Sequence, residues 1–156
     1  MNVPVVKQPI NKPWCFVATT KSVMNYYGME ITQEELADYV IEDGSGNASL
    51  LAENADKLGI EVVNKRMYLE EIKDEIIKKG NPVIVLLDYS LEQKGNHFYV
   101  VDGVNEEGLR LMCPNRGFVY WSYDFLKQIN ENYWSDSPAV GYEPHLYEAT
   151  LIQPKN

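Results

Sequence analysis

Cysteine and histidine are scarce in this sequence. Its 156 residues include two cysteines and two histidines. Two cysteines cannot build the disulfide framework of a small secreted protein, and four thiol and imidazole groups allow at most one metal site. We therefore expect no bound cofactor, while thiol chemistry stays open.

Long apolar runs are missing as well. No run approaches the roughly 18–20 residues that a membrane-spanning helix needs, and the N-terminal stretch has no continuous apolar segment like that of a signal peptide. We therefore expect no membrane segment in this chain. The expected compartment is the cytoplasm, with secretion left open.

Positive charge is also in short supply. Lys and Arg number 14 against 23 Asp and Glu, which gives a net charge of −9. Such a chain repels a phosphate backbone, so we expect no nucleic-acid partner. The composition is 45% hydrophobic and 12% aromatic, which favours a folded core over a disordered chain. At about 150 residues per domain, the sequence predicts a single domain over residues 1–156.

Helical patterns fill the first half of the chain, and strand patterns fill the second. Gly28 is a typical residue for ending the first helix, and Thr32 forms a capping box with Glu35 at the start of the next. Helices are expected over residues 15–27, 32–44, 49–58 and 69–79, and after Ser122 or Asp124. Strands are expected over residues 82–88, 97–103, 109–112, 118–121 and 146–152. This order predicts an α+β fold, with N-terminal helices packed on an antiparallel sheet.

Cys15 is the first candidate for chemistry, because it lies where a loop rich in proline gives way to the first helix. Unpaired backbone N–H groups and the dipole at a helix N-terminus favour a thiolate and lower the pKa of a cysteine. Many cysteines are instead small buried apolar residues. Position alone leaves both interpretations open.

A nucleophilic thiol needs a base within hydrogen-bonding distance. His97 starts a strand, from whose end its side chain can reach a neighbouring helix, although a hydrogen-bonded core histidine fits the pattern equally well. His145 lies in a C-terminal loop and is expected at the surface. Gln8 can donate its amide to a developing oxyanion beside the backbone N–H of Cys15, and an exposed loop glutamine is the alternative.

Short segments spread over most of the chain point to one family. They are Val3-Pro-Val-Val-Lys-Gln8, Cys15 with the following Met24-Asn-Tyr-Tyr-Gly28, Gly46-Asn-Ala-Ser-Leu-Leu51, Gly80-Asn-Pro-Val-Ile-Val85, His97-Phe-Tyr-Val-Val-Asp-Gly103 and residues 114–121. Together they resemble the bacteriocin-processing peptidases, which remove double-glycine leaders. The resemblance implies a papain-like cysteine peptidase fold and a bacterial hydrolase acting on a peptide or protein substrate. It also implies Cys15 as nucleophile, His97 as general base and Gln8 as oxyanion donor.

The third catalytic position departs from that family. The family has an aspartate followed by proline, sixteen residues after the histidine, and here the pair is Cys113 and Pro114. His97 thus lacks the carboxylate that fixes the imidazole tautomer and stabilises imidazolium. Asn115 falls on the same side of a strand as Cys113 and is the candidate replacement.

Other departures concern the nucleophile and the loop before it. Phe16 follows Cys15 where the family usually has a small residue, and the spacing from Gln8 to Cys15 is one residue longer than in transporter-fused members. Cys113 is open to three interpretations. It is a filler of a small apolar niche, a partner of Cys15 in a redox pair, or a ligand with Cys15 and His97 of a soft metal.

The sequence thus favours a standalone thiol peptidase domain that hydrolyses a peptide bond, with cleavage after Gly-Gly in a leader peptide as one possibility. Two alternatives stay open. One is a catalytically degenerate module that binds peptides without cutting them. The other is a thiol deamidase or transpeptidase on the same fold.

Overall fold

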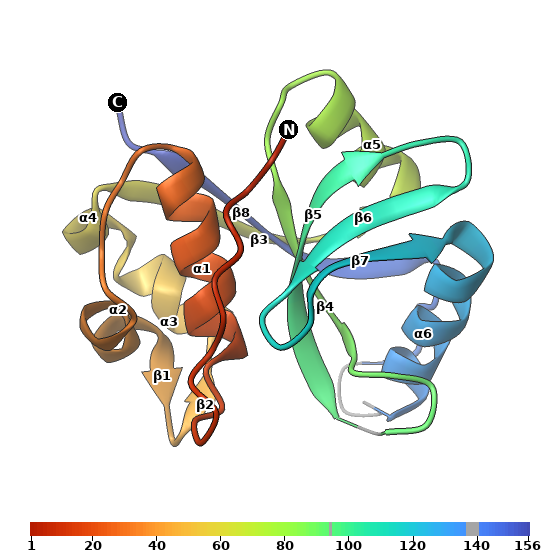
Figure 1. The fold of residues 1–156 in the computed structure, drawn as a ribbon, viewed down its shortest axis with the longest axis horizontal. Coiled ribbons are helices and arrows are strands. Elements are labelled where there is room, and N and C mark those ends of the chain that lie inside the picture. The colour runs from red at the N-terminus through yellow and green to blue at the C-terminus, as the bar shows by residue number, and fades with distance from the viewer. Residues whose placement is uncertain (94, 137–140) are drawn as a thin grey trace.

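The computed structural model describes residues 1–93, 95–136 and 141–156, and its arrangement of helices and strands is drawn in Figure 1. The elements are α1 (Cys15–Tyr26), α2 (Gln33–Val40), β1 (Ile41–Glu42), β2 (Ser45–Gly46), α3 (Ala48–Glu53), α4 (Ala55–Leu58), β3 (Ile60–Tyr68), α5 (Leu69–Ile77), β4 (Val83–Asp88), β5 (Asn96–Val104), β6 (Gly108–Cys113), β7 (Gly117–Ser122), α6 (Tyr123–Asp136) and β8 (Leu146–Pro154). Among these residues, no helix has the length and apolar character needed to cross a membrane.

A six-stranded antiparallel sheet organises the molecule, with strand order β3-β8-β4-β5-β6-β7. Strand β4 pairs along its whole length with β5, from Val83 opposite Val101 to Asp88 opposite Asn96. Strands β5, β6 and β7 form a meander that ends at α6. The α+β class and the antiparallel return of residues 109–112 are therefore confirmed.

The sheet separates two hydrophobic cores. Alternate residues of a strand point to opposite faces, so β5 contributes Val100 to one core and Tyr99 and Val101 to the other. Helices α1 to α4 cover the first face, and α5 and α6 cover the second (Figure 1). The first core contains the side chains that set α1 against β5.

Three elements differ from the sequence predictions. The second helix ends at Val40 instead of near Gly44, because Asp43 and Gly44 both adopt positive φ and form the two-residue turn between β1 and β2. The helix expected over residues 49–58 is two short helices that meet at Asn54, whose side chain donates to the Tyr39 carbonyl at 3.0 Å. Asparagine competes for backbone groups in this way and interrupts helices.

Strand β3 was not predicted at all. It lies at one edge of the sheet, and of its nine residues only Ile60 and Met67 are buried. The strand therefore shows no alternation of apolar and polar residues, which is the signal that sequence patterns rely on.

The N-terminal segment is tied to the sheet by a buried carboxylate. Asp102 is fully buried and accepts a hydrogen bond from the backbone N–H of Val3 at 2.9 Å. Arg110 binds both carboxylate oxygens of Asp102, at 2.8 and 2.7 Å, and also donates to the Met1 carbonyl at 2.7 Å. These contacts fix the start of the segment that carries Gln8.

We predict that Arg110→Met destabilises the protein by about 3 kcal/mol, because it leaves the Asp102 carboxylate buried without its ion-pair partner. Lys155→Met is the matched control. Its ion pair with Asp56 is exposed, with side chains 48% and 85% accessible, and should contribute little to stability because water screens it. Urea unfolding of the two variants measures the difference, and equal losses of stability would contradict the prediction.

Candidate active site

Cys15 is the first residue of α1, as the sequence predicts. The N-cap residue, Trp14, gives no side-chain hydrogen bond to the first turn, so the N-terminal N–H groups of the helix keep their donor capacity. The Cys15 thiol is free and its residue is half-buried. This position suits a nucleophile that a substrate can reach.

A pair of aromatic side chains sets α1 against β5. Phe16 follows Cys15 and Phe98 follows His97, and the two ring centroids are 4.3 Å apart. Gly46 of β2 packs on the same ring, since a Cβ atom there would lie 2.4 Å from the Phe16 Cβ. Phe16, an unexpected residue next to the nucleophile, is therefore a core residue that packs the start of α1 against β5 at Phe98.

The environment of the Cys15 thiol raises its pKa. Burial is the main cause, and the nearby Cys113 sulfur acts in the same direction. Backbone N–H groups of Phe98, Phe16 and Cys15 itself oppose it by stabilising the thiolate. The Phe98 contribution places the Cys15 sulfur beside the backbone of the residue that follows His97.

His97 lies in β5 with 6% of its surface exposed. Its Nε2 atom is 3.6 Å from the Sγ atom of Cys113. Tyr89 and Tyr99 face the imidazole edge-on, each with a centroid distance of 5.0 Å. The ring is therefore packed on two sides and in contact with a sulfur atom at its far nitrogen.

Arg116 is the residue of this site that sequence patterns missed. Its Nε atom is 3.3 Å from Cys113 Sγ, and its Nη2 atom donates to the Tyr99 hydroxyl at 2.9 Å and the Tyr89 carbonyl at 3.2 Å. The guanidinium also lies 4.5 Å from the Tyr89 ring centroid. The sequence holds one signal for it, because a turn that ends at Gly117 brings Arg116 back toward Cys113.

Burial lowers the pKa of His97 to about 4, and the positive charge of Arg116 adds to the shift. A cation therefore acts on the imidazole where a catalytic triad would supply an anion. Both effects favour the neutral imidazole at neutral pH.

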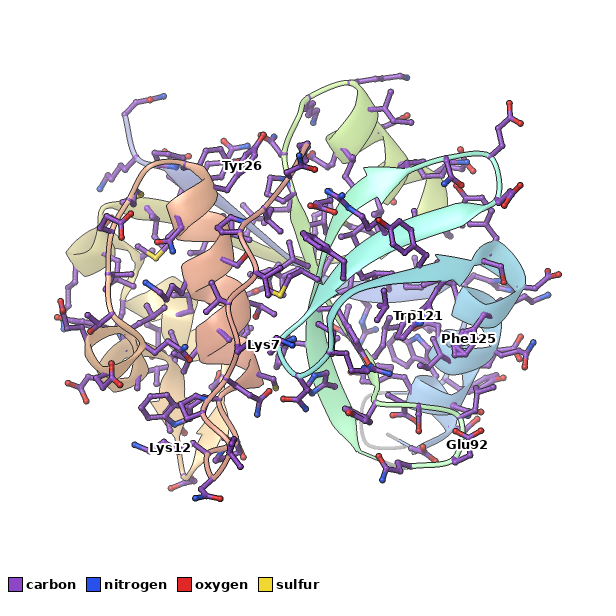
Figure 2. The ribbon with its side chains drawn as sticks, viewed as in Figure 1. Lys7, Lys12, Tyr26, Glu92, Trp121 and Phe125 are labelled. Atoms are coloured by element: carbon purple, nitrogen blue, oxygen red, sulfur yellow. The ribbon has the colours of Figure 1, made fainter. Side chains whose placement is uncertain are left out.

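Gln8 lies on the N-terminal segment, which runs in front of α1 and carries the labelled Lys7 and Lys12 (Figure 2). Its backbone N–H donates to the Pro114 carbonyl at 3.0 Å, and its side-chain amide donates to the Lys12 carbonyl at 3.0 Å. The same segment is held by Lys7, whose Nζ donates to the Asn115 carbonyl at 3.0 Å. The side-chain nitrogen carries two hydrogens, so one N–H stays available for an oxyanion while the other is donated to Lys12.

Asn115 is exposed and lines an open pocket together with His97, Tyr89 and Asn96. Among the described residues, its side chain makes no hydrogen bond to His97, whose Nε2 atom contacts Cys113 instead. Its role as the orienting group stays a prediction. His145 is exposed, as expected.

A second hollow lies on the other side of the start of β5. Its wall includes Gly46, Asn47 and Ala48 on the helical side, with Phe98 and Ala149 on the sheet side. His97 lines one hollow, and Phe98 lines the other. Within the described ranges, no three His, Cys, Asp or Glu side chains are placed to hold a metal ion.

Known structures share this architecture. A double-glycine-motif protease from an AMS/PCAT transporter, solved with its leader peptide, has a TM-score of 0.70 and 20% identity, covering 99% of this chain and 93% of that one. The peptidase domain of Streptococcus ComA, a bifunctional ABC transporter of a quorum-sensing pathway, has a TM-score of 0.70 and 20% identity, covering 99% of this chain and 100% of that one. A C39-like protein from Bacillus anthracis has a TM-score of 0.71 and 16% identity, covering 99% of this chain and 96% of that one.

These likenesses confirm the papain-like fold of the C39 peptidases, with helices on an antiparallel sheet. No curated protein sequence matches the chain. The family model described as the peptidase C39-like family matches residues 1–140, which is most of the sequence. The chain therefore belongs to the peptidase C39-like family.

Proposed function

We infer that this protein is a cysteine peptidase that hydrolyses a peptide bond with Cys15 as nucleophile and His97 as base. One observation carries the inference. The Cys15 sulfur lies at an uncapped helix N-terminus and beside the backbone N–H of Phe98, the residue that follows His97. Helix N-termini and neighbouring N–H groups are the environment in which proteins use a cysteine as a nucleophile.

In the first step, the Cys15 sulfur forms a bond to the substrate carbonyl carbon while His97 takes the thiol proton. The backbone N–H of Cys15 and the Gln8 amide stabilise the oxyanion. The C–N bond then breaks, and His97 gives its proton to the leaving amine. In the second step, water attacks the thioester carbonyl and the C–S bond breaks, which releases the carboxylic acid, and the proton that water loses reaches the Cys15 sulfur through His97.

The resting pair in this mechanism is neutral. The pKa of Cys15 is raised and that of His97 is lowered, so a thiol and an imidazole are present at neutral pH, in place of a thiolate and an imidazolium. Proton transfer must therefore accompany the attack. Because a base with a low pKa is a weak proton acceptor, we expect slow turnover.

A peptide is the substrate class that the surface supports. One hollow is lined by His97 and the other by Phe98, whose backbone N–H lies beside the Cys15 sulfur, so both border the proposed site. The double-glycine-motif protease was solved with its leader peptide, which makes Gly-Gly peptides the first substrates to test.

A peptide-binding module without catalysis is the second candidate. Cys113 replaces the carboxylate of a triad beside His97, where Arg116 adds a positive charge, and one N–H of the Gln8 amide is already donated to Lys12. Both features weaken the catalytic apparatus and leave the two hollows intact. Binding that is unchanged by Cys15→Ala, without turnover, would support this candidate.

We predict that the protein cleaves Gly-Gly peptides and that Cys15→Ala abolishes cleavage. His97→Ala should lower kcat/KM by about 100-fold or more, because general base catalysis contributes at least that much. His145→Ala is the matched control, since the second histidine is exposed and remote in sequence from the site. Mass spectrometry of the products is the measurement. Two fragments indicate hydrolysis, a gain of one dalton without fragments indicates deamidation, and no turnover above Cys15→Ala contradicts the proposal.

Alkylation by iodoacetamide tests the protonation state. We predict that the rate at Cys15 rises steadily with pH up to about 9, the range in which free cysteine ionises, with no plateau near pH 5. Cys113 should stay unmodified in the native protein, because it is fully buried. Peptide mass spectrometry reads the two sites separately. A low-pH plateau at Cys15 would show a preformed thiolate and contradict the neutral pair.

The pKa of His97 also predicts how stability depends on pH. Above pH 6.5 the imidazole is neutral in both states and contributes nothing. As pH falls from 6.5 to about 4 the unfolded chain binds a proton that the folded protein does not, so folding loses up to about 3 kcal/mol.

His97→Gln lacks this titration, and the difference between the two proteins cancels the carboxylates that titrate in the same range. Urea unfolding from pH 4 to 7 is the measurement. Parallel stability curves for wild type and variant would contradict a lowered pKa of His97.

A further inference from the structure

The sulfur of Cys113 lies between two nitrogen atoms that can donate hydrogen bonds. His97 Nε2 is 3.6 Å away, and Arg116 Nε is 3.3 Å away. The guanidinium nitrogen is always a donor, because arginine stays protonated in proteins. Because the Cys113 sulfur accepts a hydrogen bond from Arg116, its lone pairs already face the side where the two nitrogen atoms lie.

The contacts of Arg116 hold this arrangement in place. Its Nη2 atom donates to the Tyr99 hydroxyl and the Tyr89 carbonyl, and its guanidinium lies over the Tyr89 ring. Tyr89 and Tyr99 also pack against the His97 ring. The same two tyrosines thus position both groups that meet at the Cys113 sulfur.

Cys113 does more than fill a small apolar space in the core. Its backbone lies in the core shared with Leu111 and Tyr99, and its residue is fully buried. The side chain nevertheless makes two polar contacts, one of them to a cation. A cation beside a sulfur atom favours the sulfur as hydrogen-bond acceptor.

We propose that Cys113 is a positioning residue for His97. Its sulfur accepts a hydrogen bond from the Nε2–H group of His97, and Arg116 holds the sulfur in place. This hydrogen bond selects the Nε2–H tautomer and leaves the lone pair on Nδ1, the ring nitrogen nearer the β5 backbone. Nδ1 makes no hydrogen bond within the described part of the chain. The Nδ1 lone pair is then free to take the Cys15 proton.

This inference rests on the proposed peptidase function for its purpose, although the hydrogen bond itself is independent of activity. Among the described residues, those that contact His97 or act on its charge are Cys113 on β6, Arg116 on the following turn, and Tyr89 and Tyr99. None of them is a carboxylate. The sulfur can fix the ring, while Arg116 opposes formation of the imidazolium.

Imidazole ¹⁵N spectra of the wild-type protein test the hydrogen bond directly, because protonated and bare ring nitrogens resonate far apart. His97 should show Nε2–H and a bare Nδ1 at pH 7. Cys113→Ala should lose this preference and give a mixture of tautomers. Signals of His145, the other histidine, should not change. An Nδ1–H tautomer in the wild type, or an unchanged tautomer in Cys113→Ala, would overturn the proposal.

Cys113→Asp is the second variant, and it restores an acceptor with a negative charge. It should keep the Nε2–H tautomer and raise the pKa of His97 by about one to three units. A His97 pKa that is unchanged or lower in this variant contradicts the proposed contact. Amide spectra establish that both variants are folded before these signals are compared.

Peptide hydrolysis separates this inference from the proposed function. If the protein is a peptidase, Cys113→Asp should raise kcat, and Cys113→Ala should lower kcat with little change in KM. If no variant cleaves any peptide while the ¹⁵N signals behave as expected, the peptidase proposal fails and the positioning role stands. Cleavage that is equal in wild type and Cys113→Ala, with unchanged ¹⁵N signals, leaves the peptidase and removes the positioning role.

Discussion

The contact between Phe16 and Phe98 is the interaction on which the site depends. Each ring directly follows a functional candidate, Cys15 on α1 and His97 on β5, so packing the two rings places the start of α1 beside the β5 backbone next to His97. Gly46 makes the contact possible, because a larger residue on β2 would collide with Phe16. The geometry of the site is thus a consequence of core packing, which is rigid and costly to deform.

The electrostatics of the site follow from what surrounds it. Burial lowers the pKa of the imidazole and raises that of the thiol, and Arg116 adds a positive charge near His97. A carboxylate at the third catalytic position, in place of Cys113, would raise the pKa of His97 by stabilising the imidazolium. With Cys113 there, the fold keeps the positions of a papain-like site and gives it a neutral pair.

The sequence was sufficient for the elements with strong local signals. The start of α1 at Cys15, the capping box of Thr32 with Glu35 and the antiparallel return of β6 were all predictable from short patterns. Strand β3 was not, because it is an exposed edge strand without alternation. Arg116 and the two tyrosines beside His97 were missed because their contacts depend on the sheet, which brings together residues far apart in the chain. The catalytic roles of Cys15, His97, Gln8 and Asn115 stay predictions.

Trapping the acyl-enzyme tests the peptidase assignment most directly. A Gly-Gly peptide with an activated ester acylates a thiol without needing a protonated leaving group, so a slow peptidase should still accumulate the thioester. Intact-mass spectrometry should then show one acyl group per chain, mapped to Cys15 and lost with time as water hydrolyses it. Acylation should slow markedly in His97→Ala. No adduct, or an adduct that forms equally without His97, would contradict a Cys15–His97 peptidase.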